Sequence, residues 1–431
     1  MINSASSQQT LSERMDTAKE SPLFYKVFML VGAGLLLDGS DVYMASNINS
    51  TMVATKFASL AQGSMFISAG FLGLFIGSII TGYVGDFLGR RKTFQWNLLL
   101  FGLATLVGAF APNIQTLIAI RFIAAIGMGA EVITGFAMVS EFSPVKNRGK
   151  WSGCVSVFTN LGAPFGFFLS TIFITHFGWR SMFIIVGAFA LILWFMRRHL
   201  PESPRWLMVH NEENEAKKVI NKLEINGHYD TDEIKENASS STSHTRGLIV
   251  ATFAVSGTFL CQYMFTSWVP TLLLGKGINI IHSMWFSTLM MMGAPIGGII
   301  GMFLVDKIGR KKTIVPAFIF TAIAGISYAF QNTNTAILIN GLILTALLYI
   351  LMAGCVAVYA PELFDTSFRF RGNGYANGIA KLLTTLSPYF VLWVMQHSSQ
   401  YVLFTSIAAI AIISAIVIGF FGPETKKTSI Q

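Results

Sequence analysis

The sequence predicts an all-α membrane protein with twelve transmembrane helices in two pseudo-symmetric six-helix bundles. Three observations support this fold class. The chain is 53% hydrophobic and only 12% charged, whereas soluble domains carry about 25% charged residues. Its apolar segments reach the roughly 20 residues that a membrane-spanning helix needs. Short polar motifs of the first half also recur in the second half, which indicates an internal duplication.

The apolar segments divide evenly between the two halves of the chain. We expect a first bundle over residues 24–197 and a second bundle over residues 247–421. The predicted helices cover residues 24–51, 62–83, 93–111, 114–139, 151–175, 180–197, 247–270, 283–305, 313–330, 336–359, 373–395 and 400–421.

Three polar segments lie outside the bundles. Residues 1–23 form a tail without the apolar core of a signal peptide, and residues 422–431 form a second tail. Residues 198–246 connect the bundles. Apolar residues recur at helical spacing among charges over residues 211–223, which predicts a surface helix. Residues 237–244 are rich in Ser and are typical of a flexible linker.

The internal repeat preserves the order of three motifs in the two halves of the chain. The pairs are GYVGDFLGRRK at 82–92 with DKIGRKK at 306–312, Glu141 and Arg148 with Glu362 and Arg371, and PES at 201–203 with PET at 423–425. Two halves repeated in the same orientation place a binding site between them, near the middle of the bilayer.

The net charge of +9 is explained by membrane topology. With an even number of helices both termini share one side, and most of the Lys and Arg residues fall in the tails and loops of that side. The positive-inside rule therefore predicts cytoplasmic termini. This distribution also argues against nucleic-acid binding.

No enzyme motif is present. The sequence contains no P-loop, GxSxG, HExxH or CxxC pattern, so we expect neither ATP-driven chemistry nor hydrolysis. The three cysteines, Cys154, Cys261 and Cys355, lie singly in apolar segments and indicate neither a disulfide framework nor a metal site.

Two carboxylates stand inside the first predicted helix. Asp38 and Asp41 lie on one face of this helix, about 5–6 Å from each other. We expect one of them to hold a proton near neutral pH. Arg121 in the fourth helix lies at the same depth as Asp41 for a rise of about 1.5 Å per residue, which predicts an ion pair. The alternatives are a structural partner for the acid and an Arg121 that snorkels to the outer headgroups.

Two further intramembrane charges lack an obvious counter-ion. Glu131 is either a second proton site, a polar contact to a ligand, or a structural acid hydrogen-bonded to a neighbouring helix. Lys381, in the middle of the eleventh helix, needs a carboxylate from a ligand or from the protein, such as Glu362 or Glu131.

Helix 7 contributes an amide and aromatic rings to the predicted interface. Gln262 and Tyr263 stand in the segment CQYMFTSWVP at 261–270. One amide with aromatic surface suits a small ring or apolar acid. Further candidates are Tyr43, Asn160 and Trp393, although an aromatic residue in such a helix also serves as packing.

The motifs resemble those of the major facilitator superfamily, and the resemblance covers the whole chain. The loops at 82–92 and 306–312 are similar to its two signature loops. PESPRWL at 201–207 and PETKK at 423–427 are similar to the segments that close each half of the sugar porters. DGSD at 38–41 and the segment at 127–150 look more like symporters of aromatic acids, nicotinate and related organic anions.

The resemblance implies functions for several candidates. It implies that protonation of Asp41 releases Arg121 and so couples a proton to a conformational change. It implies an anion-binding cation in the eleventh helix, usually Arg and here Lys381. Sugar porters carry paired glutamines in helix 7, and the single Gln262 argues against a hexose.

The signature loops predict an ion-pair gate at the cytoplasmic face, closed when the protein faces outward. Its members are Gly82, Asp86, Gly89, Arg90, Glu141, Arg148, Glu202, Arg205, Asp306, Gly309, Arg310, Glu362 and Arg371. The alternative is a set of solvated charges that set topology and contribute about 0–1 kcal/mol per pair.

We therefore expect a proton-coupled symporter that imports a small organic anion, in particular a carboxylate, by alternating access. The expected setting is a monomer in a bacterial inner membrane, with the proton as coupling ion and no cofactor. The alternatives are a sugar or polyol symporter, a proton-driven efflux antiporter, and a nutrient sensor that does not transport.

Overall fold

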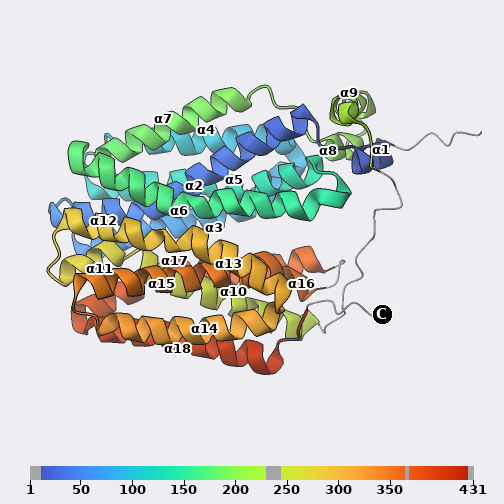
Figure 1. Ribbon diagram of the computed structural model, residues 1–431. Helices are drawn as coiled ribbons and strands as arrows, with labels where there is room; N and C mark the ends of the chain where they lie inside the picture. Colours follow the sequence, from blue (N-terminus) through green and yellow to red (C-terminus); the bar gives the residue numbers. More distant parts are fainter. Residues whose placement is uncertain (1–10, 230–243, 365–367, 426–431) are drawn as a thin grey trace, which may run out of the picture.

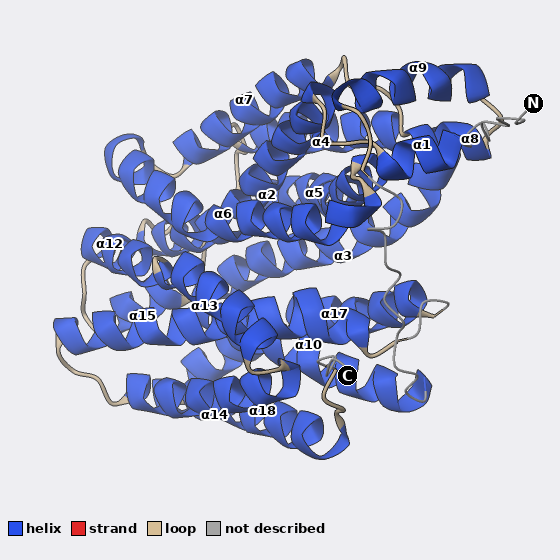
Figure 2. Ribbon diagram, turned by 45° about the vertical axis from the view of Figure 1, so that its right-hand side comes forward, coloured by secondary structure: helices blue, strands red, loops and turns tan. Residues whose placement is uncertain are grey.

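The computed structural model describes residues 11–229, 244–364 and 368–425. Within these ranges the chain is helical, and its one β-type contact is an isolated antiparallel bridge between Ala18 and His228. Figure 2 shows this all-helical character.

Two bundles of long helices make up the molecule and lie one beside the other (Figure 1). The first bundle contains α2 (Pro22–Ala54), α3 (Leu60–Leu88), α4 (Arg90–Gly108), α5 (Ile114–Phe142), α6 (Arg148–Phe177) and α7 (Arg180–Arg197). The second contains α10 (His244–Thr266) and α11 (Val269–Gly275), α12 (Ile280–Met291) and α13 (Gly293–Lys307), α14 (Arg310–Ala329), α15 (Asn334–Leu351) and the π-helix η4 (Met352–Tyr359), α17 (Arg369–His397) and α18 (Gln400–Phe421).

Eleven spans in the described ranges are long and apolar enough to cross a membrane. The predicted helix missing from these eleven is the third, residues 93–111, which corresponds to α4. The first turn of α4 is Arg90, Arg91 and Lys92, and its mean hydropathy is correspondingly low. It packs along α5 and α7 like a membrane helix. The structure thus provides the twelve spanning units that the sequence predicts.

Proline explains two interruptions in the second bundle. Ser267 and Trp268 separate α10 from α11 just before Pro270, and Met292 separates α12 from α13 just before Pro295. Proline lacks a backbone N–H and clashes with the preceding turn, so a helix breaks or restarts there. Each predicted single helix at these places is therefore two shorter ones.

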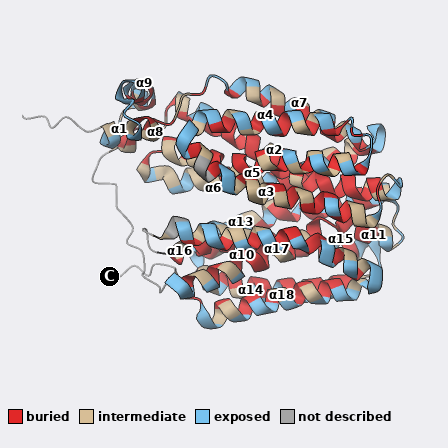
Figure 3. Cartoon of the chain, turned by 180° about the vertical axis from the view of Figure 1, so that it is seen from behind, coloured by how far each residue is buried: buried red, intermediate tan, exposed pale blue. Residues whose placement is uncertain are grey.

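Glycine allows α2 and α6 to touch through their backbones. A Cβ atom on Gly39 would lie 2.5 Å from the Thr159 carbonyl oxygen, and one on Gly162 would lie 2.7 Å from Gly39 Cα. Small residues at helix crossings are the usual means of close packing in membranes. Figure 3 shows the buried faces of the helices turned toward one another. This close crossing fixes the position of α2, which carries the two central acids.

Three short helices gather at one end of the first bundle (Figures 1 and 2). They are α1 (Leu11–Thr17), α8 (Pro204–Val209) and α9 (Glu213–Leu223), and we call them together the cap. Helix α9 corresponds to the surface helix that the sequence predicts, although it begins slightly later. The same end of the molecule carries the two signature loops, and we call it the charged end.

Candidate functional site

The central ion pair joins α2 to α5. Arg121 Nη1 donates to Asp41 Oδ2, and Arg121 Nη2 lies 3.4 Å from the Asp41 carbonyl oxygen. The side chains are 0% exposed for Asp41 and 5% exposed for Arg121. The structure therefore contains the depth-matched pair rather than an arginine that snorkels to the headgroups.

Asp38 lies one helical turn from Asp41 and is 3% exposed. Neither of its carboxylate oxygens has a hydrogen-bond partner among the residues that the structure describes. The two acids of the DGSD motif thus differ in their surroundings, because Asp41 is paired and Asp38 is not.

A second buried ion pair was not predicted. Arg197 Nη1 donates to Glu131 Oε1 at 2.7 Å, and both side chains are fully buried. Arg197 also donates to the Leu30 carbonyl from Nε at 3.1 Å and from Nη2 at 2.7 Å, and its guanidinium lies 3.9 Å from the centre of the Phe94 ring. Of the alternatives for Glu131, a contact with a neighbouring helix is the one this geometry contains.

The sequence analysis does not single out Arg197, because it is the last residue of the sixth predicted helix and is followed by Arg198. Side chains of an α-helix lean toward its N-terminus. The Arg197 side chain accordingly points back along α7 into the bundle. Gly34 leaves the space it needs, since a Cβ there would lie 1.8 Å from Arg197 Nη2.

Aromatic side chains from both bundles meet near the centre. Gln262 Nε2 donates to the Tyr43 hydroxyl at 3.1 Å. The Tyr263 ring stacks on Tyr43 at 6.2 Å and lies 4.8 Å from Phe71. Gln262 is fully buried, and its Oε1 has no hydrogen-bond partner in the described ranges. This cluster of ring surface with one free amide oxygen lies between the bundles.

Lys381 is half-buried on α17. Its amine makes no hydrogen bond or ion pair with any described residue. The two acids expected as protein partners are occupied elsewhere, since Glu362 pairs with Arg310 and Glu131 pairs with Arg197. The amine is thus left without a protein counter-ion in the described part of the chain.

Two further predicted ligand-binding residues, Asn160 and Trp393, make no hydrogen bond with Gln262. Asn160 is half-buried near the middle of α6. Trp393 is 52% exposed and stacks on Phe390 and His397 of its own helix. In this structure Trp393 lies on an exposed part of α17, and its place in the central site stays a prediction.

Hydrogen bonds between the bundles gather in the half of the molecule away from the charged end. Ser46 Oγ donates to the Ser267 carbonyl at 2.8 Å, and Ser68 Oγ donates to the Thr385 carbonyl. Thr171 and Thr288 share a hydrogen bond of 2.9 Å between their hydroxyls. The bundles are therefore held together at the end opposite the charged end.

Little empty space remains beside the central ion pair. A cavity of about 10 Å³ is bounded by Arg121, Ser46, Phe71 and Ser267, which is room for about one water molecule. A larger hollow of about 590 Å³ lies between α14 and α15, but exposed apolar side chains such as Phe320 line it and it is remote from the two ion pairs. The larger hollow therefore belongs to the outer apolar surface.

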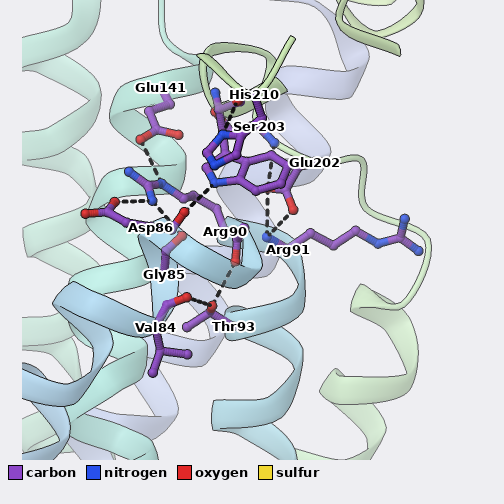
Figure 4. A network of polar contacts seen from close by, with 12 residues as sticks. Val84, Gly85, Asp86, Arg90, Arg91, Thr93, Glu141, Glu202, Ser203 and His210 are labelled. Carbon is purple, nitrogen blue, oxygen red and sulfur yellow. Dashed lines mark hydrogen bonds and ion pairs between the residues drawn. The ribbon is translucent and has the colours of Figure 1, made fainter. Parts of the chain in front are cut away.

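The first signature loop forms a compact polar network (Figure 4). Arg90 binds Asp86 at 2.6 Å and Glu141 at 3.1 Å. Glu202 accepts hydrogen bonds from the backbone N–H of Arg91 at 3.0 and 3.2 Å. A carboxylate is favoured at this place by the free N–H groups of the α4 N-terminus.

The second signature loop repeats these contacts. Arg310 pairs with Asp306 at 3.3 Å and with Glu362 through two hydrogen bonds of 2.9 and 3.0 Å. Glu424 accepts from the backbone N–H of Arg310 at 2.8 Å. Sequence reasoning did not name Glu424, although the repeat of PES as PET makes it the counterpart of Glu202.

The charged residues of the predicted gate pair across different sequence motifs. Glu141 binds Arg90 rather than Arg148, and both Arg148 and Arg205 approach Asp16 of the cap, at 3.7 and 2.5 Å. Arg371 is exposed at the start of α17. Gly82 belongs to α3, and its surroundings lie outside what the structure describes. The Arg90 and Arg310 networks each stay within one bundle.

The comparisons with known proteins agree with this architecture. Residues 23–431 match the family described as sugar (and other) transporter. The chain is 30% identical to the inner membrane metabolite transport protein YdjE of Escherichia coli, over 98% of this chain and 97% of that one. It is 27% identical to the niacin transporter NiaP of Acinetobacter baylyi, over 98% and 99%.

A solved structure shares the fold. The inward open conformation of the xylose transporter XylE from E. coli superimposes with a TM-score of 0.74 at 18% identity, covering 94% of this chain and 98% of that one. The family match spans nearly all of the chain. The chain therefore belongs to the sugar (and other) transporter family of the major facilitator superfamily and is a multi-pass membrane transporter.

Proposed function

We propose that this transporter imports a small aromatic carboxylate together with a proton across a bacterial inner membrane. The observation that carries the proposal is the Lys381 amine, which lies in the middle of a membrane-spanning helix without a counter-ion in the described ranges. A charge in that position is costly unless a partner neutralises it. The carboxylate of the substrate is that partner in our proposal.

The central rings provide the second part of the site. Tyr43, Tyr263 and Phe71 offer stacking surface, and the free oxygen of Gln262 offers a hydrogen-bond acceptor. A flat ring needs such surface and few polar contacts. The relative NiaP, whose name gives niacin as its substrate, supports this choice, since niacin is an aromatic ring bearing one carboxylate.

The Asp41–Arg121 pair supplies proton coupling in this proposal. Protonation of Asp41 removes its charge and frees Arg121, and deprotonation restores the pair. A buried guanidinium without a partner is costly by several kcal/mol. Each protonation state of Asp41 therefore favours a different arrangement of α2 and α5, which is what coupling requires.

The conformation follows from the proposed topology. The positive-inside rule places the charged end in the cytoplasm. Because the hydrogen bonds between bundles gather at the opposite end, the structure corresponds to a state closed toward the outside. Alternating access then requires these hydrogen bonds to break when the outer side opens.

Substrate selection is tested with purified protein in liposomes. Uptake of niacin and benzoate is compared with that of nicotinamide, benzamide and xylose, because each amide keeps the ring and the approximate size of its acid but lacks the negative charge. We expect both acids to be taken up and both amides and xylose to be ignored. Uptake of xylose with no response to the acids supports the sugar symporter alternative and overturns the proposal.

Single-residue variants test the functions proposed for Lys381 and Asp41. Lys381→Gln is expected to abolish acid uptake, Lys381→Arg to retain part of it, and Lys222→Gln on the exposed surface of α9 to leave it unchanged. An inward proton gradient should drive accumulation in the wild type. Asp41→Asn should exchange substrate without accumulating it. Full accumulation by Asp41→Asn contradicts the coupling, and acid-driven extrusion instead of uptake identifies an antiporter.

A further inference from the structure

The fully buried side chains in the described part of the protein include more acids than bases. The fully buried charged side chains are three acids, Asp38, Asp41 and Glu131, and two arginines, Arg121 and Arg197. Lys381 is only half-buried, lies on α17 of the other bundle, and is not part of this set. With every group ionised this set carries one negative charge in excess. One proton on one of the three acids makes it neutral.

The contacts identify which acid is left over. Asp41 binds Arg121, and Glu131 binds Arg197. Asp38 has neither an ion pair nor a hydrogen bond from the described residues to either carboxylate oxygen. An ionised carboxylate that is buried without partners costs several kcal/mol even after the protein relaxes, so the neutral acid is the stable form of such a side chain.

Asp38 stands between the two ion pairs along α2. Asp41 with its Arg121 lies one turn away in one direction. Gly34 lies one turn away in the other, where a Cβ would come within 2.1 Å of Glu131 Oε1. Asp38 therefore experiences the charges of Glu131, Arg197 and Asp41 together, and its protonation depends on how these neighbours are paired.

The other membrane helices that pack on α2 add no charge beside Asp38. Residues 60–85 of α3 and 269–275 of α11 contain no Asp, Glu, Lys, Arg or His, and the one such residue of α12, His282, lies in its first turn. Helix α6, which packs closely on α2, carries no Asp, Glu, Lys, Arg or His between Lys150 and His176. Helix α4 presents the Phe94 ring to Arg197. The charges that determine the state of Asp38 are therefore those of α2, α5 and α7 named above.

We propose that Asp38 is a proton-binding site distinct from the Asp41–Arg121 pair, and that Arg197 creates it by neutralising Glu131. In this closed-outside state Asp38 holds a proton, Asp41 and Glu131 are ionised, and the buried set is neutral. Arg197 is a positioning residue, since it acts on Asp38 through Glu131. The inference extends the proton coupling of the proposed function but does not depend on the identity of the substrate.

Infrared spectroscopy of the purified wild-type protein tests the inference directly. A protonated carboxylic acid has a C=O stretching band separate from the bands of a carboxylate. At neutral pH we expect one such band from a buried acid. It should be absent in Asp38→Asn and present in Glu213→Gln, which removes an exposed acid of α9.

Variants of the neighbouring pair give opposite expected changes. Glu131→Gln leaves Arg197 without its carboxylate, so Asp38 should ionise beside it and the band should disappear. Arg197→Gln leaves two acids without a cation, so a second protonated carboxyl should appear. The double variant Glu131→Gln/Arg197→Gln removes one charge of each sign, and the single band of Asp38 should return.

The outcomes are distinct from those of the transport assays. A protonated-acid band that survives in Asp38→Asn overturns the inference, as does a band of equal strength in Glu131→Gln and in the double variant. These spectra need folded protein but no transport activity. If Arg197→Gln alone does not fold, the comparison uses Glu131→Gln and the double variant, in which no buried acid loses its cation. A failure of niacin uptake with these spectra as expected would count against the proposed substrate and leave the Asp38 site intact.

Discussion

Glu202 and Glu424 occupy equivalent positions of the internal repeat and bind equivalent helix starts in the two bundles. Each carboxylate accepts a backbone hydrogen bond from the first turn of the helix that follows a signature loop, at 3.0 Å in the first bundle and 2.8 Å in the second. Each also fills the space beside a glycine with positive φ, Gly89 at 91° and Gly309 at 124°. The segment that closes each bundle is thereby tied to that bundle's own loop.

The glycine positions yield the first prediction. Gly89→Ala and Gly309→Ala should each destabilise the protein by about 1–2 kcal/mol, because alanine is strained at positive φ. The added methyl group would also lie 2.3 or 2.8 Å from the carboxylate oxygen. Thermal unfolding of the purified variants measures the effect. Gly227→Ala has positive φ but no atom near its Cβ, so it separates strain from crowding. Equal losses in all three variants would rule out the contribution of the carboxylate contact.

The crossing of α2 over the Glu131–Arg197 pair gives a second prediction. Gly34→Ala should displace the pair and cost about 3–5 kcal/mol, the usual effect of breaking a buried ion pair. Gly153→Ala on α6 has nothing within 4 Å and should be neutral or stabilising by up to about 1 kcal/mol. Thermal unfolding compares the two helix glycines. A Gly34→Ala variant as stable as Gly153→Ala would contradict the described packing.

Glu20 links the cap to the first bundle and predicts a pH dependence. Its carboxylate accepts hydrogen bonds from Asn147 at 2.7 Å, Trp151 at 2.8 Å and Tyr229 at 2.8 Å. Burial raises the pKa of Glu20, but these hydrogen bonds outweigh burial and lower the pKa below its usual value. The stabilisation is therefore complete above the usual pKa and is lost as the pH falls through the lowered one.

Glu20→Gln should accordingly lower the stability of the protein by about 1–2 kcal/mol at neutral pH. The difference from the wild type should shrink in acid, where Glu20 itself becomes protonated. Melting temperatures measured from neutral pH to about pH 3 follow this change. A difference that stays constant over the whole range would show that the charge of Glu20 does not contribute.

The Thr171–Thr288 contact predicts a reversible block. Its two hydroxyl oxygens lie 2.9 Å apart across the bundles, so we expect the thiols of cysteines at these two positions to come close enough to form a disulfide. Oxidation should hold the outer end closed and abolish uptake, and a reductant should restore it. The single cysteine variants serve as controls. Full uptake by the oxidised pair would show that this contact does not open during transport.

The helices and the central pair follow directly from the sequence. Long apolar segments define the spans, and a rise of about 1.5 Å per residue places Asp41 and Arg121 at one depth. The depth of a residue in the membrane does not by itself predict the ion-pair partner of a long side chain at a helix end, such as Arg197. Arg197 reaches Glu131 because its side chain leans back along α7 and because Gly34 leaves room, and both conditions depend on how three helices cross.

The signature-loop charges illustrate the same limit. Neither Arg90 nor Arg148 is within one helical turn of Glu141 in the sequence, so spacing does not choose between them. The choice depends on how the start of α4 faces the end of α5. In the structure Arg90 also binds Asp86 one turn away, which holds its guanidinium toward Glu141.

The cap has a practical consequence for imaging the transport cycle. Arg14 of α1 binds Glu224 just after α9, Asp16 binds Arg205 of α8, and Glu20 binds side chains of the first bundle. The cap is thus fastened to one bundle and should travel with it as a single body. An antibody fragment directed at α9 would add mass for electron microscopy and would bind both end states of the cycle with equal affinity, so it would leave their populations unchanged.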